Sequence, residues 1–350
     1  MQCDHDNSAD LLEQVNYALN EDIPLRIQGS NSKHMLGGHV SGEVLDTRIH
    51  RGIVNYDPTE LVITARAGTS LWEIEAALDH AGQMLPFEPP HFGPDATVGG
   101  MVASGLSGPR RPWAGAVRDY VLGVQVIIGN GKLLRFGGEV MKNVAGYDLS
   151  RLMAGSFGTL GVITEVSLKV LPKPRASASL SLNMDPAQAL ANLARWGQQP
   201  IPISAACHDG SLLHLRIEGG DGSVKSALSI LGGEPLDNGF WRDLREHETD
   251  FFKSSEPLWR LSLPSDVSPY ILPGKQILDW GGSQRWLKTN ESADAIREVV
   301  EHLGGHATLY AQGDSSLHPI FKALMKYQKN LKNQFDPQNI FNPGRIGSEA

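Results

Sequence analysis

Apolar and polar residues follow one another along the first half of the chain in patterns that predict helices and strands in turn. An apolar face between residues 11 and 19 predicts a helix that is capped by Ser8. Short strands are predicted over 25–28 and 61–66, and capping-box spacing at residues 70–73 predicts the start of a second helix. These elements together predict a βαβ-like unit at the start of the protein.

A glycine-rich turn and a proline-rich break close this half. The segments 121–128 and 132–136 flank Gly129-Asn130-Gly131, which predicts an antiparallel hairpin because glycine and asparagine tolerate the left-handed backbone of such a turn. Apolar and polar residues then alternate over 162–170, which predicts a half-buried strand. Pro172-Lys173-Pro174 stops that strand, and we place a domain boundary there.

Beyond this break the pattern becomes that of an α+β layer. Strands are predicted over 177–183, 203–207, 212–217, 258–263, 276–280, 284–288 and 306–310, and helices over 186–196, 223–231, 292–303 and 319–333. This order favours a ferredoxin-like arrangement, in which helices cover one face of an antiparallel sheet. No repeat is clear enough in the sequence to indicate a duplication.

Length and composition fit a globular protein of about two domains, at roughly 150 residues each. Of the 350 residues 41% are apolar and 20% are charged, and we find no apolar run of about eighteen residues and no basic-then-apolar leader. We therefore expect a cytoplasmic protein. A formal net charge of -8 argues against a nucleic-acid partner. With Cys3 and Cys207 as its cysteines, the sequence excludes a disulfide framework and a four-thiolate metal or iron–sulfur site.

The chain has 38 glycines, and they gather between Gly93 and Gly161. Backbone amides approach a pyrophosphate closely only where bulky side chains are absent, and the segments 29–33, 94–105 and 155–163 meet that requirement. Each segment alone is more typical of a turn, but the three together favour a bound dinucleotide. Neither a Gly-x-Gly-x-x-Gly after the first strand nor a Gly-Lys-Ser or Gly-Lys-Thr occurs, which excludes Rossmann and Walker-type loops.

Ordered motifs over about half of the chain resemble the vanillyl-alcohol-oxidase and p-cresol-methylhydroxylase (PCMH) superfamily of FAD-binding proteins. The motifs are 26–33, Ala96-Thr97-Val98-Gly99-Gly100 with 113–123, 142–152, 155–163, and Asp336-Pro337 through Asn342-Pro343-Gly344-Arg345. The resemblance implies an α+β protein with a two-part, PCMH-type FAD-binding domain over 1–172. It also implies a reduced ferredoxin-like cap domain over 173–330, and a C-terminal tail over 331–350 that returns to the FAD domain.

The same resemblance implies which residues hold FAD. The pyrophosphate would lie on Gly29, Ser30, Asn31, Ser32 and Lys33. The second phosphate and the isoalloxazine ring would lie on Thr97, Gly99, Gly100, Ser104 and Gly105. The adenosine half would meet backbone atoms of Gly158, Gly161, Val162 and Ile163, and Asn342 would close over the flavin. Arg118 and Asp119 would support the flavin, although an ordinary surface ion pair explains them almost as well.

Within the superfamily the likeness is to the flavin subunits of bacterial glycolate oxidase. In such an assembly the chain would act with a homologous catalytic FAD subunit and an iron–sulfur subunit on glycolate or a similar 2-hydroxy acid. Covalent relatives bond the flavin to a histidine of the first loop, and because Asn31 falls at that place we expect non-covalent FAD. Any contact with a membrane would come through the partners, because the sequence shows no span or amphipathic anchor.

The residues that would oxidise a hydroxy acid are not evident. The reaction needs a group that orients the carboxylate and a proton acceptor near the hydroxyl. Hydroxy-acid relatives carry metal ligands in Gly-Asp-Gly-Asn-x-His and His-Gly-x-Gly segments, and residues 173–330 contain neither, so we expect no metal. His302 and His306 are four residues apart, but Gly304-Gly305 between them favours a surface or turn role.

For two other groups of residues the sequence allows more than one interpretation. Arg110-Arg111 could clamp a carboxylate or phosphate, or face solvent. The tryptophans at 241, 259, 280 and 286 are more typical of a core or an interface than of catalysis.

Three functions therefore stay open. The chain could relay electrons as one FAD subunit of a glycolate-oxidising complex, which the missing substrate residues favour. It could be a self-sufficient FAD-dependent 2-hydroxy-acid dehydrogenase. It could also be a scaffold subunit whose FAD loops are vestigial.

Overall fold

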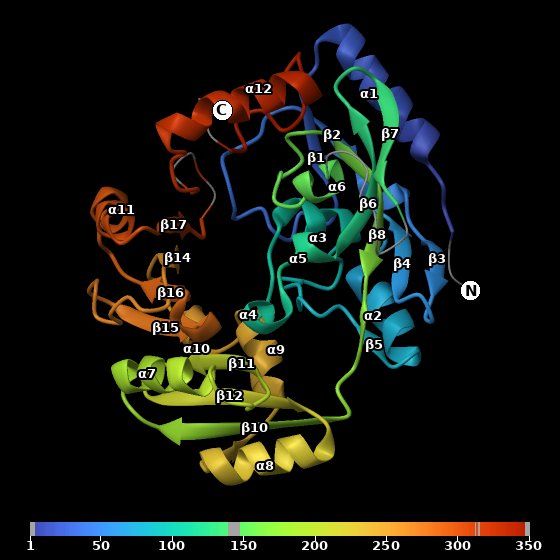
Figure 1. The fold of residues 1–350 in the computed structure, drawn as a ribbon. Coiled ribbons are helices and arrows are strands. Elements are labelled where there is room, and N and C mark those ends of the chain that lie inside the picture. The colour runs from blue at the N-terminus through green and yellow to red at the C-terminus, as the bar shows by residue number, and fades with distance from the viewer. Residues whose placement is uncertain (1–3, 139–147, 312, 314–315, 347–350) are drawn as a thin grey trace.

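A five-stranded antiparallel sheet forms the centre of the N-terminal half (Figure 1). The computed structural model describes residues 4–138, 148–311, 313 and 316–346. The strands lie in the order β3 (Ile53–Asp57), β4 (Val62–Arg66), β8 (Val162–Lys169), β6 (Val121–Ile128) and β7 (Lys132–Gly137). β6 and β7 form the hairpin that the glycine-rich turn predicts.

The central strand β8 is buried on both faces, so the prediction of a half-buried strand is wrong. Every residue from Val162 to Leu168 is buried. Val166 and Leu168 pack into the main core of this half, whereas Val162 packs against α1 (Ser8–Glu21). The polar residues that alternate with them find partners inside the protein: Thr164 donates to the carbonyl of Gln125 at 3.1 Å.

The predicted βαβ-like unit is also wrong, because β1 (Leu25–Gln28) and β4 belong to different sheets. β1 pairs in parallel with β2 (Glu43–Asp46), and the connection between them contains no helix. β4 instead pairs with β3 and β8. β3 lies between β1 and β4 in the sequence, and its polar residues interrupt the apolar pattern, so it was not predicted as a strand. α2 (Leu71–His80) follows β4 as predicted, capped by Ser70.

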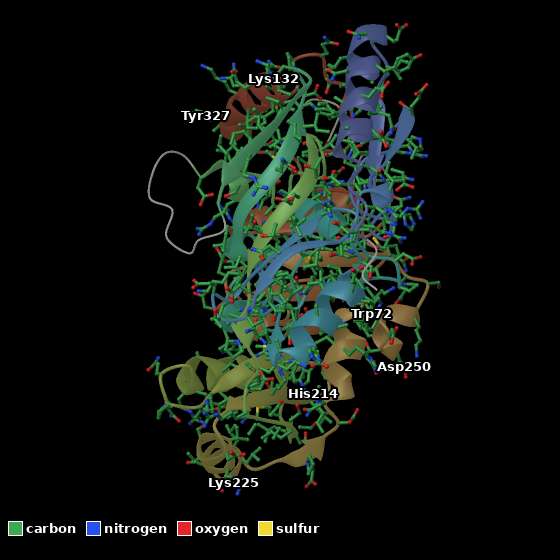
Figure 2. All side chains as sticks on the ribbon, turned by 90° about the vertical axis from the view of Figure 1, so that its right-hand side faces the viewer. Trp72, Lys132, His214, Lys225, Asp250 and Tyr327 are labelled. Atoms are coloured by element: carbon green, nitrogen blue, oxygen red, sulfur yellow. The ribbon has the colours of Figure 1, made fainter. Side chains whose placement is uncertain are left out.

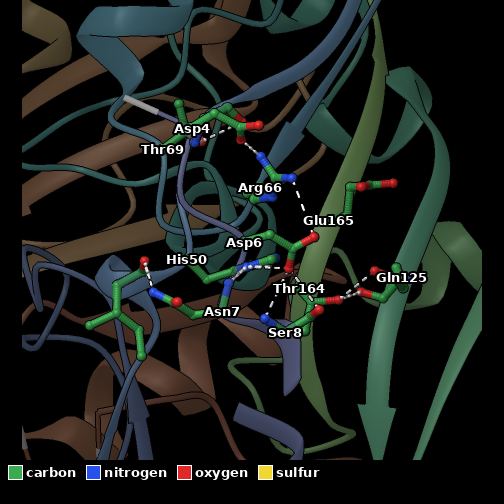
Figure 3. Close-up of polar contacts among 12 residues, drawn as sticks. Asp4, Asp6, Asn7, Ser8, His50, Arg66, Thr69, Gln125, Thr164 and Glu165 are labelled. Carbon is green, nitrogen blue, oxygen red and sulfur yellow. Dashed lines mark hydrogen bonds and ion pairs between the residues drawn. The ribbon is translucent and has the colours of Figure 1, made fainter. Parts of the chain in front are cut away.

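A small group of charges ties the N-terminal segment to β4 (Figure 3). Arg66 forms ion pairs with Asp4 and with Asp6, the second at 3.3 Å. α1 has Asn7 rather than Ser8 at its N-cap position, so the predicted cap is wrong by one residue. The hydroxyl of Ser8 donates to Asp6 at 2.7 Å, because this carboxylate also accepts the Ser8 amide and draws the side chain away from the helix end.

The second half contains an eight-stranded sheet that is made of two similar parts. The first part contains β10 (Ala176–Asn183), α7 (Pro186–Trp196), β11 (Ile203–His208), β12 (Leu212–Gly219), α8 (Asp221–Leu231) and β13 (Glu234–Leu236). The second part contains β14 (Leu258–Ser262), β15 (Lys275–Asp279), β16 (Gln284–Lys288), α11 (Ala293–His302) and β17 (His306–Leu309). In both parts the strands lie in the order fourth, first, third, second.

This strand order confirms the predicted ferredoxin-like layer. It also shows a duplication that the sequence does not reveal. The second strands of the two parts, β11 and β15, pair antiparallel at the centre of the sheet. Trp241, Trp259 and Trp286 are buried in the cores of this half, as their type predicts.

Besides β2, β3 and β13, several short elements were not predicted, because glycine, proline and polar residues leave little periodicity in them. They are α3 (Val98–Ser104), α4 (Arg111–Ala114), α5 (Val117–Tyr120), α6 (Leu149–Leu152), α9 (Gly239–Arg245), α10 (Asp250–Lys253), two 3-10 turns over 47–49 and 280–282, and the paired strands β5 (Gln83–Met84) and β9 (Leu171–Pro172).

A buried network of charges joins the two halves. Arg110 lies 3.3 Å from Glu88 in its own half and ion-pairs with Glu218 of β12, while Arg216 of β12 lies 2.9 Å from Glu88. The guanidinium of Arg111 lies 4.4 Å above the ring of Trp280. Both arginines contact the other half. Arg111 is also exposed, as one of the two alternatives predicts, whereas Arg110 is buried and is neither a ligand clamp nor a solvated surface residue.

The C-terminal helix α12 (Lys322–Phe335) leads the chain back to the N-terminal half, which confirms the predicted return (Figure 1). Phe335 packs into the core of that half, and Phe341 lies beside Leu25 in a parallel bridge. The last strand of the five-stranded sheet along the chain, β8, ends at Lys169, and the first strand of the eight-stranded sheet, β10, begins at Ala176. That change of sheet supports a domain boundary at residue 172, which stays a proposal.

The molecule is long in one direction. Figure 2 shows Lys132 and Tyr327 near one end and Lys225 of α8 at the other. Among the described residues, no helix is both long enough and apolar enough to cross a membrane.

Candidate functional site

A cavity of about 220 Å³ lies between the loop after β1, the helix α3 and the C-terminal tail. Its walls include nine of the residues that the resemblance assigns to FAD: Gly29, Ser30, Asn31, Ser32, Lys33, Thr97, Gly100, Ser104 and Asn342. The fold therefore brings three distant segments of the sequence to one place. Arg26, His39 and Arg345 line the same cavity, although the sequence did not single them out as site residues.

Close packing between the first loop and α3 explains why residue 29 is a glycine. A Cβ atom on Gly29 would lie 2.3 Å from Oγ1 of Thr97. That oxygen also accepts the amide of Gly100 at 3.2 Å and so caps α3. Because glycine has no side chain, the loop backbone can approach α3 this closely, and the loop amides therefore lie beside the cavity.

Lys33 places a buried ammonium group at the wall of the cavity. Its side chain is 9% exposed, and Nζ donates to the carbonyl of His91 at 3.0 Å and to Ser32 at 3.1 Å. Burial lowers the pKa of Lys33 to about 8, and the nearby charge of Glu246 offsets part of this effect. An anion bound beside this group would favour its charged form.

Asn342 joins the tail to the other two walls. Its side-chain oxygen accepts the amide of Ile27 at 2.7 Å, and its side-chain nitrogen donates to the carbonyl of Phe157 at 2.7 Å. The backbone of Asn342 has a φ of 42°, a left-handed conformation that asparagine tolerates better than most residues. The residue is thus a structural clasp as well as part of the cavity wall.

A second cavity of about 380 Å³ shares Asn342 and Arg345 with the first and reaches toward α12. Arg26 Nε in the first cavity wall and Ser156 Oγ in the second are buried, and neither has a hydrogen-bond partner among the described residues. Buried polar atoms almost always have a partner, so such atoms typically mark the place of a bound polar ligand or water. Loop amides, a lysine, unpartnered donors and an adjoining partly apolar cavity fit the phosphates and the adenosine of FAD.

Four of the other predicted FAD residues lie outside the walls of the first cavity. Gly99 packs on Ala67, where a Cβ would come within 2.8 Å of the alanine side chain, and Gly105 packs on the backbone of Gly155. Arg118 and Asp119 are exposed on α5, and Asp119 accepts the amide of Ala116 at 2.8 Å. Contact of these residues with FAD stays a prediction.

The predicted adenosine residues lie at or near β8. A Cβ on Gly158 would lie 2.7 Å from the side-chain nitrogen of Asn342, which places this glycine next to the cavity wall. Gly161 packs against the carbonyl of Ile127, and the side chains of Val162 and Ile163 are buried in the core. A contact with FAD would need backbone atoms, and it stays a prediction. Residues 142–147 of the matching motif lie outside the described residues.

A small cavity of about 20 Å³ lies between the two halves. Its walls combine Phe92 and Ser107 from the N-terminal half with side chains of the cap: His247, Arg260, Asp279, Trp286 and Tyr310. Among these wall residues the sequence singled out Trp286 alone, as typical of a core or an interface. Phe92 also faces Lys33, whose Nζ lies 5.8 Å from the ring centre. The interface cavity is therefore next to the first cavity.

The charges of this interface cavity are unusual for a buried place. Arg260 hydrogen-bonds to Tyr310 and, within the described part of the chain, forms no ion pair. Burial raises the pKa of Asp279 to about 7, although Trp280 and Gln284 donate hydrogen bonds to it. Burial, with the charges of Lys288 and Arg260, lowers the pKa of His247 to about 3. The cavity thus combines a cation, a neutral imidazole and a carboxyl that titrates near neutral pH.

The histidines with helical spacing lie elsewhere. His302 hydrogen-bonds to the carbonyl of Glu298 at 2.8 Å, and the ring of His306 lies 6.1 Å from that of His318. No group of three or more potential metal ligands occurs among the residues that the structure describes.

Comparisons with known proteins agree with the fold and with FAD as the cofactor. A family profile described as "FAD binding domain" matches residues 5–137. Glycolate oxidase subunit GlcE of Escherichia coli (strain K12) is 57% identical over 348 residues, 99% of each chain. Glycolate oxidase subunit GlcD of Bacillus subtilis (strain 168) is 35% identical over 161 residues, which are 45% of this chain and 34% of that one.

A solved structure extends the likeness of fold to almost the whole chain. Alkyldihydroxyacetonephosphate synthase superposes with a TM-score of 0.68 at 15% identity, over 97% of this chain and 75% of that one. Identity above one half over nearly the full length of both chains leaves no doubt about the relationship to the first relative. The protein carries an FAD binding domain and belongs to the family of the glycolate oxidase subunit GlcE.

Proposed function

We propose that this protein is the GlcE-type FAD subunit of an oxidase that converts glycolate, or a similar small 2-hydroxy acid, to the 2-oxo acid. The 57% identity with the Escherichia coli glycolate oxidase subunit, over 99% of both chains, carries this proposal. The match of another glycolate oxidase subunit to 45% of the chain supports it. When bound, FAD supplies the acceptor for the hydride that leaves the carbon of the substrate.

The residues of the two adjoining cavities would hold FAD without a covalent bond. Gly29 to Ser32 and Lys33 would bind the pyrophosphate with backbone amides, hydroxyls and one ammonium group. Ser156 and the apolar residues beside α12 would surround the adenosine. Phe92 lines the interface cavity and lies next to Lys33 of the first cavity, and we place the isoalloxazine ring in this direction.

We infer that the chain acts with a homologous flavin subunit and an iron–sulfur subunit. The names of both glycolate oxidase relatives contain the word subunit, which supports an assembly of more than one chain. Any association with a membrane would come through these partners.

Reconstitution from purified chains tests the proposed function. We expect the tagged chain to co-purify with the homologous flavin subunit and the iron–sulfur subunit, and the complex to reduce a dye with glycolate. Leaving this chain out should abolish most of that activity. Full glycolate oxidation without this chain would contradict the proposal.

A second candidate function is that this chain oxidises the substrate itself. The observation that favours it is the interface cavity, where Arg260 has no carboxylate partner among the described residues. At about 20 Å³ the cavity has room for roughly one water molecule, so the two halves would have to move apart to admit a substrate. Arg260 would then orient the substrate carboxylate, and Asp279, with a pKa of about 7, would accept the hydroxyl proton. The surrounding aromatic rings would exclude water.

Stopped-flow reduction of the isolated chain separates the two candidates. Flavin bleaching by glycolate without partners would support oxidation by this chain, and no bleaching would support the relay role. If the chain oxidises glycolate itself, Arg260→Lys should raise KM about tenfold or more, because a single point charge replaces a bidentate contact. An absorbance band at about 450 nm in the purified chain would exclude the scaffold role.

A further inference from the structure

The eight-stranded sheet has one helix fewer than its internal symmetry predicts. In the first part α7 connects the first strand β10 to the second strand β11. In the second part residues 263–274 connect β14 to β15, and they form neither a helix nor a strand. Because β11 and β15 pair at the centre, a helix in the second part would lie next to α7 on the same face of the sheet.

The connection over 263–274 is fixed in place without filling that space. Arg285 of β16 is completely buried and donates to the carbonyls of Val267, Ser268 and Gly282. Val267, Ile271 and Leu272 pack into the core of the second part. The segment therefore covers the strands of its own part as a flat layer and leaves the space beside α7 open.

A groove of about 850 Å³ occupies this space. One side is the outer face of α7, where Ala187, Ala191 and Ala194 are exposed and Leu190 is half-buried. The other side is the connection at 265–269, and Trp113 of α4, which is 40% exposed, lines one end. Among the described residues that line the groove, Asp266 alone carries a charge.

These features together point to a helix as the occupant. Three alanines at successive turns of α7 allow close approach of a second helix axis. A three-turn helix of about 10 Å diameter and about 15 Å length fills roughly 1,200 Å³, so a groove of about 850 Å³ accepts two of its turns. The negative charge of Asp266 at an otherwise uncharged wall favours a partner with a basic residue at that point.

We propose that this groove receives a helix of the homologous flavin subunit, with an apolar ridge against α7 and a lysine or arginine beside Asp266. The proposal rests on the proposed function, which supplies the partner. The inserted helix takes the position that the internal symmetry leaves open, so one chain completes the helical layer of the other.

Arginine substitutions on α7 test the proposal in the full chain. Ala191→Arg with Ala194→Arg fills the groove with two long cations, and both residues are exposed and keep a good helix former. Ala76→Arg is the matched control, because Ala76 is an exposed alanine of α2 on the other side of the molecule (Figure 1). Binding to the purified flavin subunit is measured by calorimetry, and FAD content and the melting temperature are measured for each isolated variant.

We expect the double variant to bind at least about tenfold more weakly than the wild type, and the control to bind as the wild type does. FAD content and melting temperature should be unchanged in both variants. Equal affinity of the double variant and the wild type would overturn the groove proposal while leaving the proposed function intact. If the flavin subunit does not bind the wild type at all, both proposals are wrong. If the isolated wild type sediments as a dimer that the double variant dissolves, the occupant is a second copy and the proposal is overturned.

Discussion

We expect Lys33 to make the affinity for FAD depend on pH, because burial makes its ammonium group easier to deprotonate before the ligand binds. Its pKa is lowered to about 8 by burial. Below pH 8 the charge is present in the free protein, and above pH 8 binding of an anion must take up a proton. We expect the FAD dissociation constant to be constant below pH 8 and to rise by up to about tenfold per unit above it.

Fluorescence titration with FAD between pH 6.5 and 9.5 measures this dependence. Lys33→Met removes the titrating group, so the variant should bind FAD more weakly and with a flat profile over the same range. A wild-type profile parallel to that of the variant would contradict the role of Lys33.

Asp279 makes stability depend on pH in the opposite sense from an ordinary carboxylate. Its pKa is raised from 3.8 to about 7 by burial, so the folded protein holds the proton more tightly than the unfolded chain. The resulting stability is complete below about pH 4 and is lost as pH rises toward 7, by up to about 1.4 kcal/mol per unit. Urea unfolding of Asp279→Asn at pH 5, 6, 7 and 8 should lack this slope. Asp10→Asn, at an exposed position of α1, should keep it.

Single site residues were predictable from the sequence where one short motif contains several groups that can bind a ligand. They were not predictable where the fold alone brings distant residues together. The loop 29–33 carries its amides and lysine within five residues, so its place in a cavity wall could be anticipated. Gly99 and Gly100 are adjacent in the sequence, yet Gly100 faces the cavity and Gly99 packs on Ala67, because residues 98–104 form a helix. Arg260 appears in the sequence only as one cation within an apolar strand.

At the scale of elements, Asn342 is one of the side chains that hold the C-terminal tail against the N-terminal half. Asn342→Ala removes two hydrogen bonds of 2.7 Å, to Ile27 and Phe157, and also places alanine at a φ of 42°. We expect the free energy of unfolding to fall by about 2–4 kcal/mol, from the lost bonds and the strained backbone. Asn342→Gly loses the same bonds without the strain, so it should be the more stable of the two. Urea unfolding compares them, and an alanine variant as stable as the glycine variant would contradict this account.

Most long elements were predictable, and the error in strand connection has one cause. Strands and helices of the cap carry clear periodicity, so their bounds agree closely with those predicted. β3 was not predicted because Asn55 and Asp57 interrupt its apolar pattern. Without β3, the sequence pattern made β1 and β4 consecutive strands of one unit. Pairing between distant strands is a property of the folded chain, and local periodicity does not report it.

At the scale of the whole molecule, the charge network around Arg110 decides how firmly the two halves hold together. Arg110→Ala leaves the largely buried carboxylates of Glu88 and Glu218 with one partner fewer. We expect a loss of about 3–5 kcal/mol, because an uncompensated buried charge is costly. Scanning calorimetry should show two separate transitions in the variant. Arg242→Ala removes an exposed ion pair with Asp243 and should leave the transition unchanged.

The internal duplication of the cap is a feature that this single sequence does not reveal. The two parts of the cap share a strand order, but their side chains have diverged until the similarity is a matter of topology. The resemblance of the glycine-rich motifs identified the FAD half and its tail. The interface cavity and the groove beside α7 needed the arrangement in space.

The position of the clasp at Asn342 also orders events during biosynthesis. One wall of the first cavity is made of residues 342 and 345, which the ribosome adds long after the loop and the helix that form the other walls. If FAD binds there, a nascent chain should retain it only after residue 345 has left the ribosome. We therefore expect nascent chains that stall before residue 342 to be colourless.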